Sequence, residues 1–152
     1  MRSPAERYSY RRDPTVPPFP DDRPLIVFDG VCGLCSASAR FVLRHDRRGV
    51  FRLSAAQSPL GRALYRHYGL DPDAMETVLV VAEGRAYAKT DAAVLVLTRL
   101  GLPWSAAGAA RLVPRALADR LYDRLARNRY RIAGRRDRCM VPPAEWRERF
   151  IA

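Results

Sequence analysis

The sequence predicts an α/β domain in which short strands alternate with helices, followed by a helical C-terminal third. Short apolar runs at 25–28, 50–53 and 77–81 are bounded by turn residues, as buried strands are. The stretches between them carry apolar residues at helical spacing. The chain has 152 residues, of which 48% are hydrophobic, and this fits one globular domain with a real core.

The boundaries of these elements follow from turn and capping residues. In chain order we expect a strand at 25–28, a helix at 34–45, a strand at 50–53, a helix at 59–68, strands at 77–81 and 86–88, and a helix at 91–100. Asp29-Gly30 ends the first strand, and Ser58-Pro59 supplies an N-cap and a first helical position. Glu83-Gly84 makes the turn of a hairpin, and Gly101 ends the last of these helices.

The order β-α-β-α-β-β-α calls for a partly parallel sheet with a final hairpin at its edge. It is the order of the minimal thioredoxin fold, so the predicted fold class is a thioredoxin-like α/β fold with a helical C-terminal extension. In the extension, residues 103–112 form a short connector helix or loop. A longer amphipathic helix spans 114–131, with Leu117, Leu121 and Leu125 toward the core.

Residues 1–23 are predicted to be a flexible arm ahead of a domain at 24–152. Four prolines between residues 14 and 20 prevent a helix and leave no ladder donors, so deletion of residues 1–22 is expected to leave the fold intact. No apolar run approaches the roughly 20 residues that span a bilayer, and none follows the N-terminal arginines as in a signal peptide. We therefore expect no membrane span and a cytoplasmic location.

The chain is strongly basic, with a net charge of +11. Lys89 is its only lysine, so arginine carries nearly all of the positive charge. The arginines are spread along the whole chain without a nucleic-acid-binding motif. Charge alone therefore does not indicate nucleic acid as the main partner.

Three cysteines, Cys32, Cys35 and Cys139, suggest redox chemistry instead of a disulfide scaffold. Cys32 and Cys35 enclose Gly33 and Leu34 where a predicted strand ends and a helix begins. A helix N-terminus favours the thiolate, which is the nucleophile in thiol–disulfide exchange. The three-residue spacing turns the second sulfur back toward the first across one helical turn.

This arrangement predicts a thiol–disulfide oxidoreductase. Cys32, expected nearer the open end, attacks a substrate disulfide, and Cys35, one turn deeper, resolves the mixed disulfide. The partner would be a disulfide-containing protein or a small thiol substrate, with an unidentified electron donor. No cofactor is required.

Asp29 precedes Cys32 by three residues and has two possible roles. It could take the proton from Cys35 or tune the pair, or it could only cap the turn with its side chain. In the tuning role, Asp29→Asn should lower the apparent thiol pKa and slow resolution, with little loss of stability.

The main alternative is a non-catalytic basic binding module whose cysteines bind a metal or only pack. Structural zinc usually needs four ligands, and beyond the pair only Cys139, His45 and His67 remain. Phosphatase chemistry is excluded more firmly. Val31 stands where a second aspartate of an Asp-x-Asp motif would be, and no arginine lies six residues after either Cys32 or Cys35.

The cysteine motif and the C-terminal segment resemble those of a known family. Residues 29–35 match the Asp-x-x-Cys-x-x-Cys signature that names the DCC family, and 126–131, 134–139 and Pro142 are similar to its C-terminal segment. The resemblance covers about residues 24–151. It implies a thioredoxin-like fold and thiol–disulfide oxidoreductase activity, without naming a substrate.

Two features of the sequence bear on that implied activity. Thioredoxins carry a cis-proline before the strand that faces the motif, and 75–77 contains no proline here. Cys139 stands among arginines, which favour a thiolate. It is either a third redox thiol or a half-buried cysteine of a C-terminal loop. Near it, Tyr130 is expected in the core, and Arg129 either packs over a helix or binds an anion.

Overall fold

A four-stranded mixed sheet forms the centre of the protein in the computed structural model, which describes residues 10, 14–20, 22–73, 78–82, 85–101, 103–134 and 144–151. The strands are β1 (Leu25–Phe28), β2 (Arg52–Ala55), β3 (Leu79–Ala82) and β4 (Arg85–Ala88), in the order β2-β1-β3-β4. β1 pairs parallel with β2 and antiparallel with β3, and β3 and β4 form an antiparallel hairpin. The thioredoxin-like fold predicted from the sequence is confirmed.

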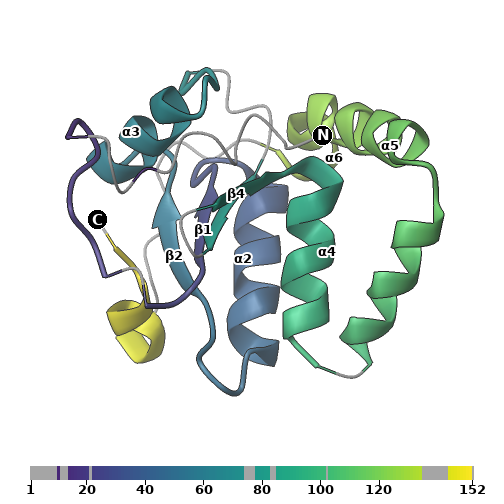
Figure 1. Ribbon diagram of the computed structural model, residues 1–152, viewed down its shortest axis with the longest axis horizontal. Helices are drawn as coiled ribbons and strands as arrows, with labels where there is room; N and C mark the ends of the chain where they lie inside the picture. The colour runs from purple at the N-terminus through teal and green to yellow at the C-terminus, as the bar shows by residue number, and fades with distance from the viewer. Residues whose placement is uncertain are drawn as a thin grey trace.

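Helices cover both faces of this sheet (Figure 1). The helices α2 (Gly33–His45) and α4 (Lys89–Arg99) lie on one face, and α3 (Pro59–His67) lies on the other. Alternation along β1 divides the core between them, because Ile26 and Phe28 pack with α2 and α4 whereas Leu25 and Val27 pack with α3. No helix of the described residues is long and apolar enough to cross a membrane.

Local capping chemistry places α3 where the sequence predicted it. The Ser58 hydroxyl accepts a hydrogen bond from the Gly61 amide at 3.0 Å, and Pro59 occupies the first turn. β2, in contrast, begins at Arg52 instead of residue 50. The amides of Val50 and Phe51 donate to the Asp46 carboxylate, each at 2.9 Å, and are therefore engaged before the ladder begins.

The C-terminal third is helical, as predicted, but its apolar face was assigned wrongly. After η2 (Trp104–Leu112), the helix α5 (Arg115–Arg127) ends at Asn128 and a short α6 (Arg129–Ala133) follows. Leu117, Leu121 and Leu125 are not in the core, because they are 50%, 61% and 48% exposed. The sheet face is already occupied by α2 and α4, so α5 packs mainly against α4 and α6 and leaves these leucines largely exposed. The spacing of the leucines in α5 shows that they lie on one face of the helix, but it does not show whether another element covers that face.

The N-terminal segment is not simply a solvated arm. Tyr10 and Val16 are buried against the α3 face of the core, with Phe19 packed beside them. At the other end of the chain, η3 (Ala144–Arg149) is followed by a residue that contacts the sheet. The amide of Ile151 donates a hydrogen bond to the Leu53 carbonyl of β2 at 2.8 Å. The division into an arm at 1–23 and a domain at 24–152 stays a prediction, but the arm contributes to the core.

Truncating the arm should therefore cost stability while preserving the fold. Val16→Ala removes two buried methyl groups, and we expect it to lower the free energy of unfolding by about 2 kcal/mol. Val113→Ala makes the same change at a side chain that is 41% exposed, and it should cost less than about 0.5 kcal/mol. Urea unfolding measures both. If both variants lose the same free energy of unfolding, the N-terminal segment does not contribute to the core.

Candidate active site

The Cys32-Gly33-Leu34-Cys35 segment begins α2, directly after the turn that follows β1. Cys32 is the N-cap residue, with extended backbone angles of φ −77° and ψ 122°. Its sulfur accepts a hydrogen bond from the Cys35 amide at 3.3 Å. A cysteine thus holds the place of the usual Ser or Asp cap, and one backbone amide of the first helical turn donates to its sulfur. Both cysteines are free thiols in this structure.

The exposure of the two cysteines is the reverse of the sequence-based expectation. Cys32 was placed nearer the open end, but its exposed fraction is 0%, whereas Cys35 is only partly buried. The end of α6 packs against the start of α2, where the Gly33 amide donates to the Gly134 carbonyl at 3.1 Å. The motif alone could not reveal this contact, because its two partners lie about a hundred residues apart in the chain.

The environment of Cys35 favours its protonated form. Burial raises the pKa of the Cys35 thiol most, and a hydrogen bond to Cys32 and the negative charges of Cys32 and Asp29 raise it further. The Arg129 guanidinium acts in the opposite direction but more weakly. Cys35 is therefore a thiol that keeps its proton at neutral pH.

Asp29 is the centre of a buried hydrogen-bond network beside the cysteines. Its side chain is 2% exposed. Oδ1 accepts from the Val31 amide at 3.1 Å and from Gln57 Nε2 at 2.7 Å. Oδ2 accepts from the Tyr130 hydroxyl at 2.5 Å and lies 3.7 Å from an Arg129 nitrogen. The bond from the Val31 amide is the turn cap expected from the sequence, whereas the role of Asp29 as a proton acceptor or tuner of the cysteine pair stays a prediction.

Three members of this network were not identified as site residues from the sequence. Tyr130 was expected in the core but is half-buried, with its hydroxyl on Asp29. Arg129 is buried and lies 4.7 Å from the centre of the Tyr130 ring, and the anion that it binds is Asp29. Both lie in the C-terminal segment that carries the family resemblance, which was the available signal. No pattern in the sequence marked Gln57.

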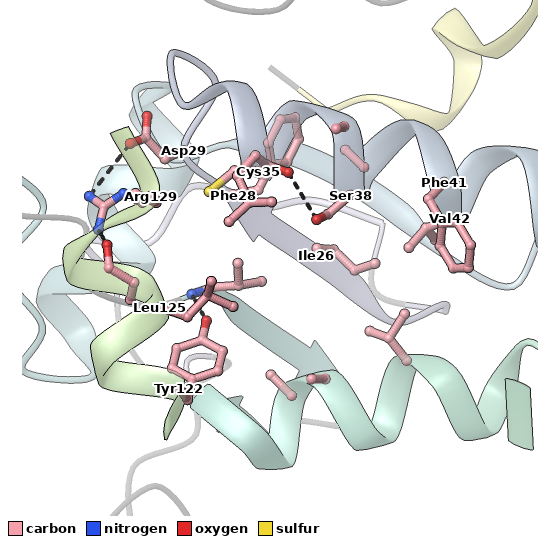
Figure 2. A pocket seen from close by; sticks show the side chains of 18 of the residues that line it. Ile26, Phe28, Asp29, Cys35, Ser38, Phe41, Val42, Tyr122, Leu125 and Arg129 are labelled. Atoms are coloured by element: carbon pink, nitrogen blue, oxygen red, sulfur yellow. Dashed lines mark hydrogen bonds and ion pairs between the residues drawn. The ribbon is translucent and has the colours of Figure 1, made fainter. Parts of the chain in front are cut away.

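Cys35 lines a pocket of about 500 Å³ between the sheet and the helices α2, α4, α5 and α6 (Figure 2). Cys35, Asp29 and Arg129 lie at one end, and Phe41 and Val42 lie at the other. We call it the Cys35 pocket. Its lining residues are Ile26, Phe28, Asp29, Leu34, Cys35, Ala37, Ser38, Ala39, Phe41, Val42, Val78, Lys89, Ala92, Ala93, Val96, Leu97, Tyr122, Leu125, Ala126 and Arg129.

Comparison with known proteins decides the family. The family model described as DCC1-like thiol-disulfide oxidoreductase matches residues 26–135. The chain belongs to this DCC1-like family. The match runs from β1 to the end of α6 and so includes both the cysteine motif and the Arg129–Tyr130 pair that reaches Asp29.

Two relatives of the DCC1-like chain are similar over most of their length. The uncharacterized protein YuxK of Bacillus subtilis is 32% identical over 127 residues, which is 84% of this chain and 93% of that protein. A chloroplastic DCC family protein of Arabidopsis thaliana is 38% identical over 120 residues, or 78% of this chain and 70% of that protein. No solved structure matches the chain.

Metal ligands do not gather at the DCC1-like motif in the described part of the chain. No group of three or more His, Cys, Asp or Glu side chains there is placed to hold an ion. His45 is at the opposite end of α2 from Cys35, about 15 Å away by helix geometry. Cys139 and the segment at 75–77, which lacks the proline of thioredoxins, lie outside the described residues.

The raised pKa of Cys35 has a direct consequence for alkylation. Iodoacetamide reacts with the thiolate, so the rate at Cys35 should keep rising tenfold per pH unit beyond pH 9.0, its ordinary pKa. An unperturbed thiol would level off there. Peptide mapping of the reduced protein between pH 7 and pH 10 follows the rate at this residue. A plateau below pH 9 would contradict the structure.

Proposed function

We propose that this protein catalyses dithiol–disulfide exchange at Cys32 and Cys35 through a mixed-disulfide intermediate. One observation carries the proposal: the two thiols are hydrogen-bonded to each other at the first turn of α2, where the Cys35 amide also donates to the Cys32 sulfur. A pair held in this way is placed to close a disulfide, and opening of that disulfide by an incoming thiolate releases the second cysteine.

Asp29 would tune this pair through its charge. Both of its carboxylate oxygens are engaged by neighbouring donors, so it acts on Cys35 at a distance and is a positioning residue. Its charge disfavours a second anion at Cys35 and keeps one proton on the reduced pair. The substrate would be a disulfide-containing protein or a small thiol, with an unidentified electron donor. A cytoplasmic location stays a prediction.

The alternative, a non-catalytic basic module whose cysteines bind metal, has less support. The described residues offer the pair no third ligand. A purely structural role would account for Cys32 as the helix cap, but it would not account for a second cysteine, Cys35, at the border of a pocket.

Turnover tests the proposal. With dithiothreitol as the dithiol and a small fluorogenic disulfide as the acceptor, the exchange rate should rise in proportion to protein concentration at substoichiometric protein. Metal-free buffer with a chelator should leave that rate unchanged. A rate equal to the uncatalysed exchange at all protein concentrations would reject the proposal.

A further inference from the structure

We propose that the Cys35 pocket binds the apolar group of a small-molecule thiol, whose sulfur forms the mixed disulfide with Cys35. This inference rests on the proposed function and names its substrate class and the reacting cysteine. Neither follows from the motif, which by itself favours Cys32 as the residue that meets the substrate.

The size and enclosure of the pocket suit a small molecule. Its volume of about 500 Å³ lies within the range of roughly 300–1,000 Å³ that is usual for ligand pockets. Strand β1 forms its floor, α2 and α4 form its sides, and Tyr122 and Leu125 of α5 lie across from α2 (Figure 2). Because a strand and several helices enclose this cavity on different sides, it suits a compact group better than an extended peptide.

The walls offer apolar contact because their polar groups are already engaged. The Ser38 hydroxyl donates to the Leu34 carbonyl at 2.9 Å, and the Tyr122 hydroxyl accepts from the Val78 amide at 3.1 Å. The Lys89 ammonium is paired with Asp123 at 3.0 Å. A bound group therefore gains mostly from burying its own hydrocarbon surface.

Access decides which cysteine reacts. Cys35 borders the pocket, whereas Cys32 does not line it and is fully buried. A substrate sulfur arriving through the pocket meets Cys35 first. In the reduced protein Cys35 keeps its proton and is a poor nucleophile. In the oxidised protein its sulfur is instead the atom that an incoming thiolate can attack, and the sulfur that then leaves is that of Cys32, which accepts a hydrogen bond from the Cys35 amide.

The exchange then balances in two steps. A substrate thiolate attacks the Cys35 sulfur, a bond forms between these two sulfurs, the Cys32–Cys35 bond breaks, and Cys32 leaves as a thiolate. A second substrate thiolate attacks the bound substrate sulfur and releases Cys35, which takes up a proton. Two thiols are thereby oxidised to one disulfide, and the protein disulfide is reduced to a dithiol.

A series of linear alkanethiols from ethanethiol to hexanethiol tests the pocket. Their thiols have nearly the same acidity, so intrinsic reactivity stays constant along the series. The rate of reduction of the oxidised protein, divided by the rate with a free dialkyl disulfide, should rise about threefold to fourfold per methylene until the pocket is filled. A flat ratio would overturn the inference, as would an equal gain with cysteine peptides that carry apolar neighbours.

Two alanine-to-phenylalanine variants distinguish binding of the alkanethiol in the pocket from a general effect of thiol hydrophobicity. Ala93 is exposed and lines the pocket, so Ala93→Phe should fill it without disturbing the core and should abolish the dependence on chain length. Ala116→Phe adds the same group at an exposed helical position outside the pocket and should preserve the dependence. Loss of the dependence in both variants, or in neither, would contradict the assignment.

The site of the mixed disulfide is checked separately in a Cys139→Ser background. At about pH 10, where more of the free Cys35 thiol is ionised, dihexyl disulfide should add one hexylthio group to the Cys32→Ser protein and none to the Cys35→Ser protein, as measured by intact mass. An adduct only in the Cys35→Ser protein would assign the reaction to Cys32. If the pair cannot be oxidised at all, the proposed function itself fails, whereas reduction at equal rates by all thiols overturns only this inference.

Discussion

Asp29→Asn is expected to lower the free energy of unfolding of the reduced protein by about 3 kcal/mol. The carboxylate receives three hydrogen bonds and faces a guanidinium, all while buried. An amide has only one acceptor oxygen, so its NH₂ group would face a donor of Gln57 or Tyr130. The buried Arg129 guanidinium would also lose the negative charge of Asp29. The sequence-based expectation of little stability loss is therefore revised.

The matched control for this substitution is Asp71→Asn. Asp71 accepts a hydrogen bond from the amide two residues later at 2.8 Å, as Asp29 does, but it is exposed and lies outside the network. It should cost less than about 0.5 kcal/mol in the same urea titration. Asp29→Asn should also lower the pKa of Cys35, because a negative charge that raises it is removed. If Asp29→Asn lowers the free energy of unfolding by less than about 1 kcal/mol, the hydrogen bonds around Asp29 do not stabilise the fold as proposed.

Replacing either motif cysteine with serine should reduce catalysed exchange to the uncatalysed rate. A single sulfur can form a mixed disulfide but has no partner that resolves it. Cys139→Ser serves as the control and should retain exchange if Cys139 is only a loop cysteine. Rates with dithiothreitol and the fluorogenic disulfide measure all three variants. Full activity in either motif variant would remove the pair from the mechanism.

The parts of the structure that were predictable depend on local chemistry. Ser58 and Pro59 cap α3 through contacts within one turn, and the motif cysteines meet at the start of α2 for the same reason. β2 starts late because the Asp46 carboxylate accepts hydrogen bonds from the amides of Val50 and Phe51, the two residues before the strand. Strand propensity does not predict this contact. Burial of Val16 and exposure of Leu121 likewise depend on which layers are already occupied.

The candidate site was predictable only in its contiguous part. Asp29, Cys32 and Cys35 lie within one short segment, so spacing alone brought them together. Tyr130 reaches Asp29 across 101 residues, and the packing of α6 against α2 then buries Cys32 and leaves Cys35 at the pocket. This tertiary packing makes Cys35 more exposed than Cys32, the opposite of what the geometry of a single helix suggested.

The state of the two motif thiols across a glutathione redox series tests the central claim most directly. Equilibration of the protein in buffers of decreasing reduced-to-oxidised glutathione ratio, followed by acid quenching, alkylation and mapping, counts free Cys32 and Cys35. We expect both thiols to disappear together at a single midpoint and to return together on reduction, and we expect denaturation to release no zinc. Thiols that persist at every ratio, or one zinc released per chain, would contradict it.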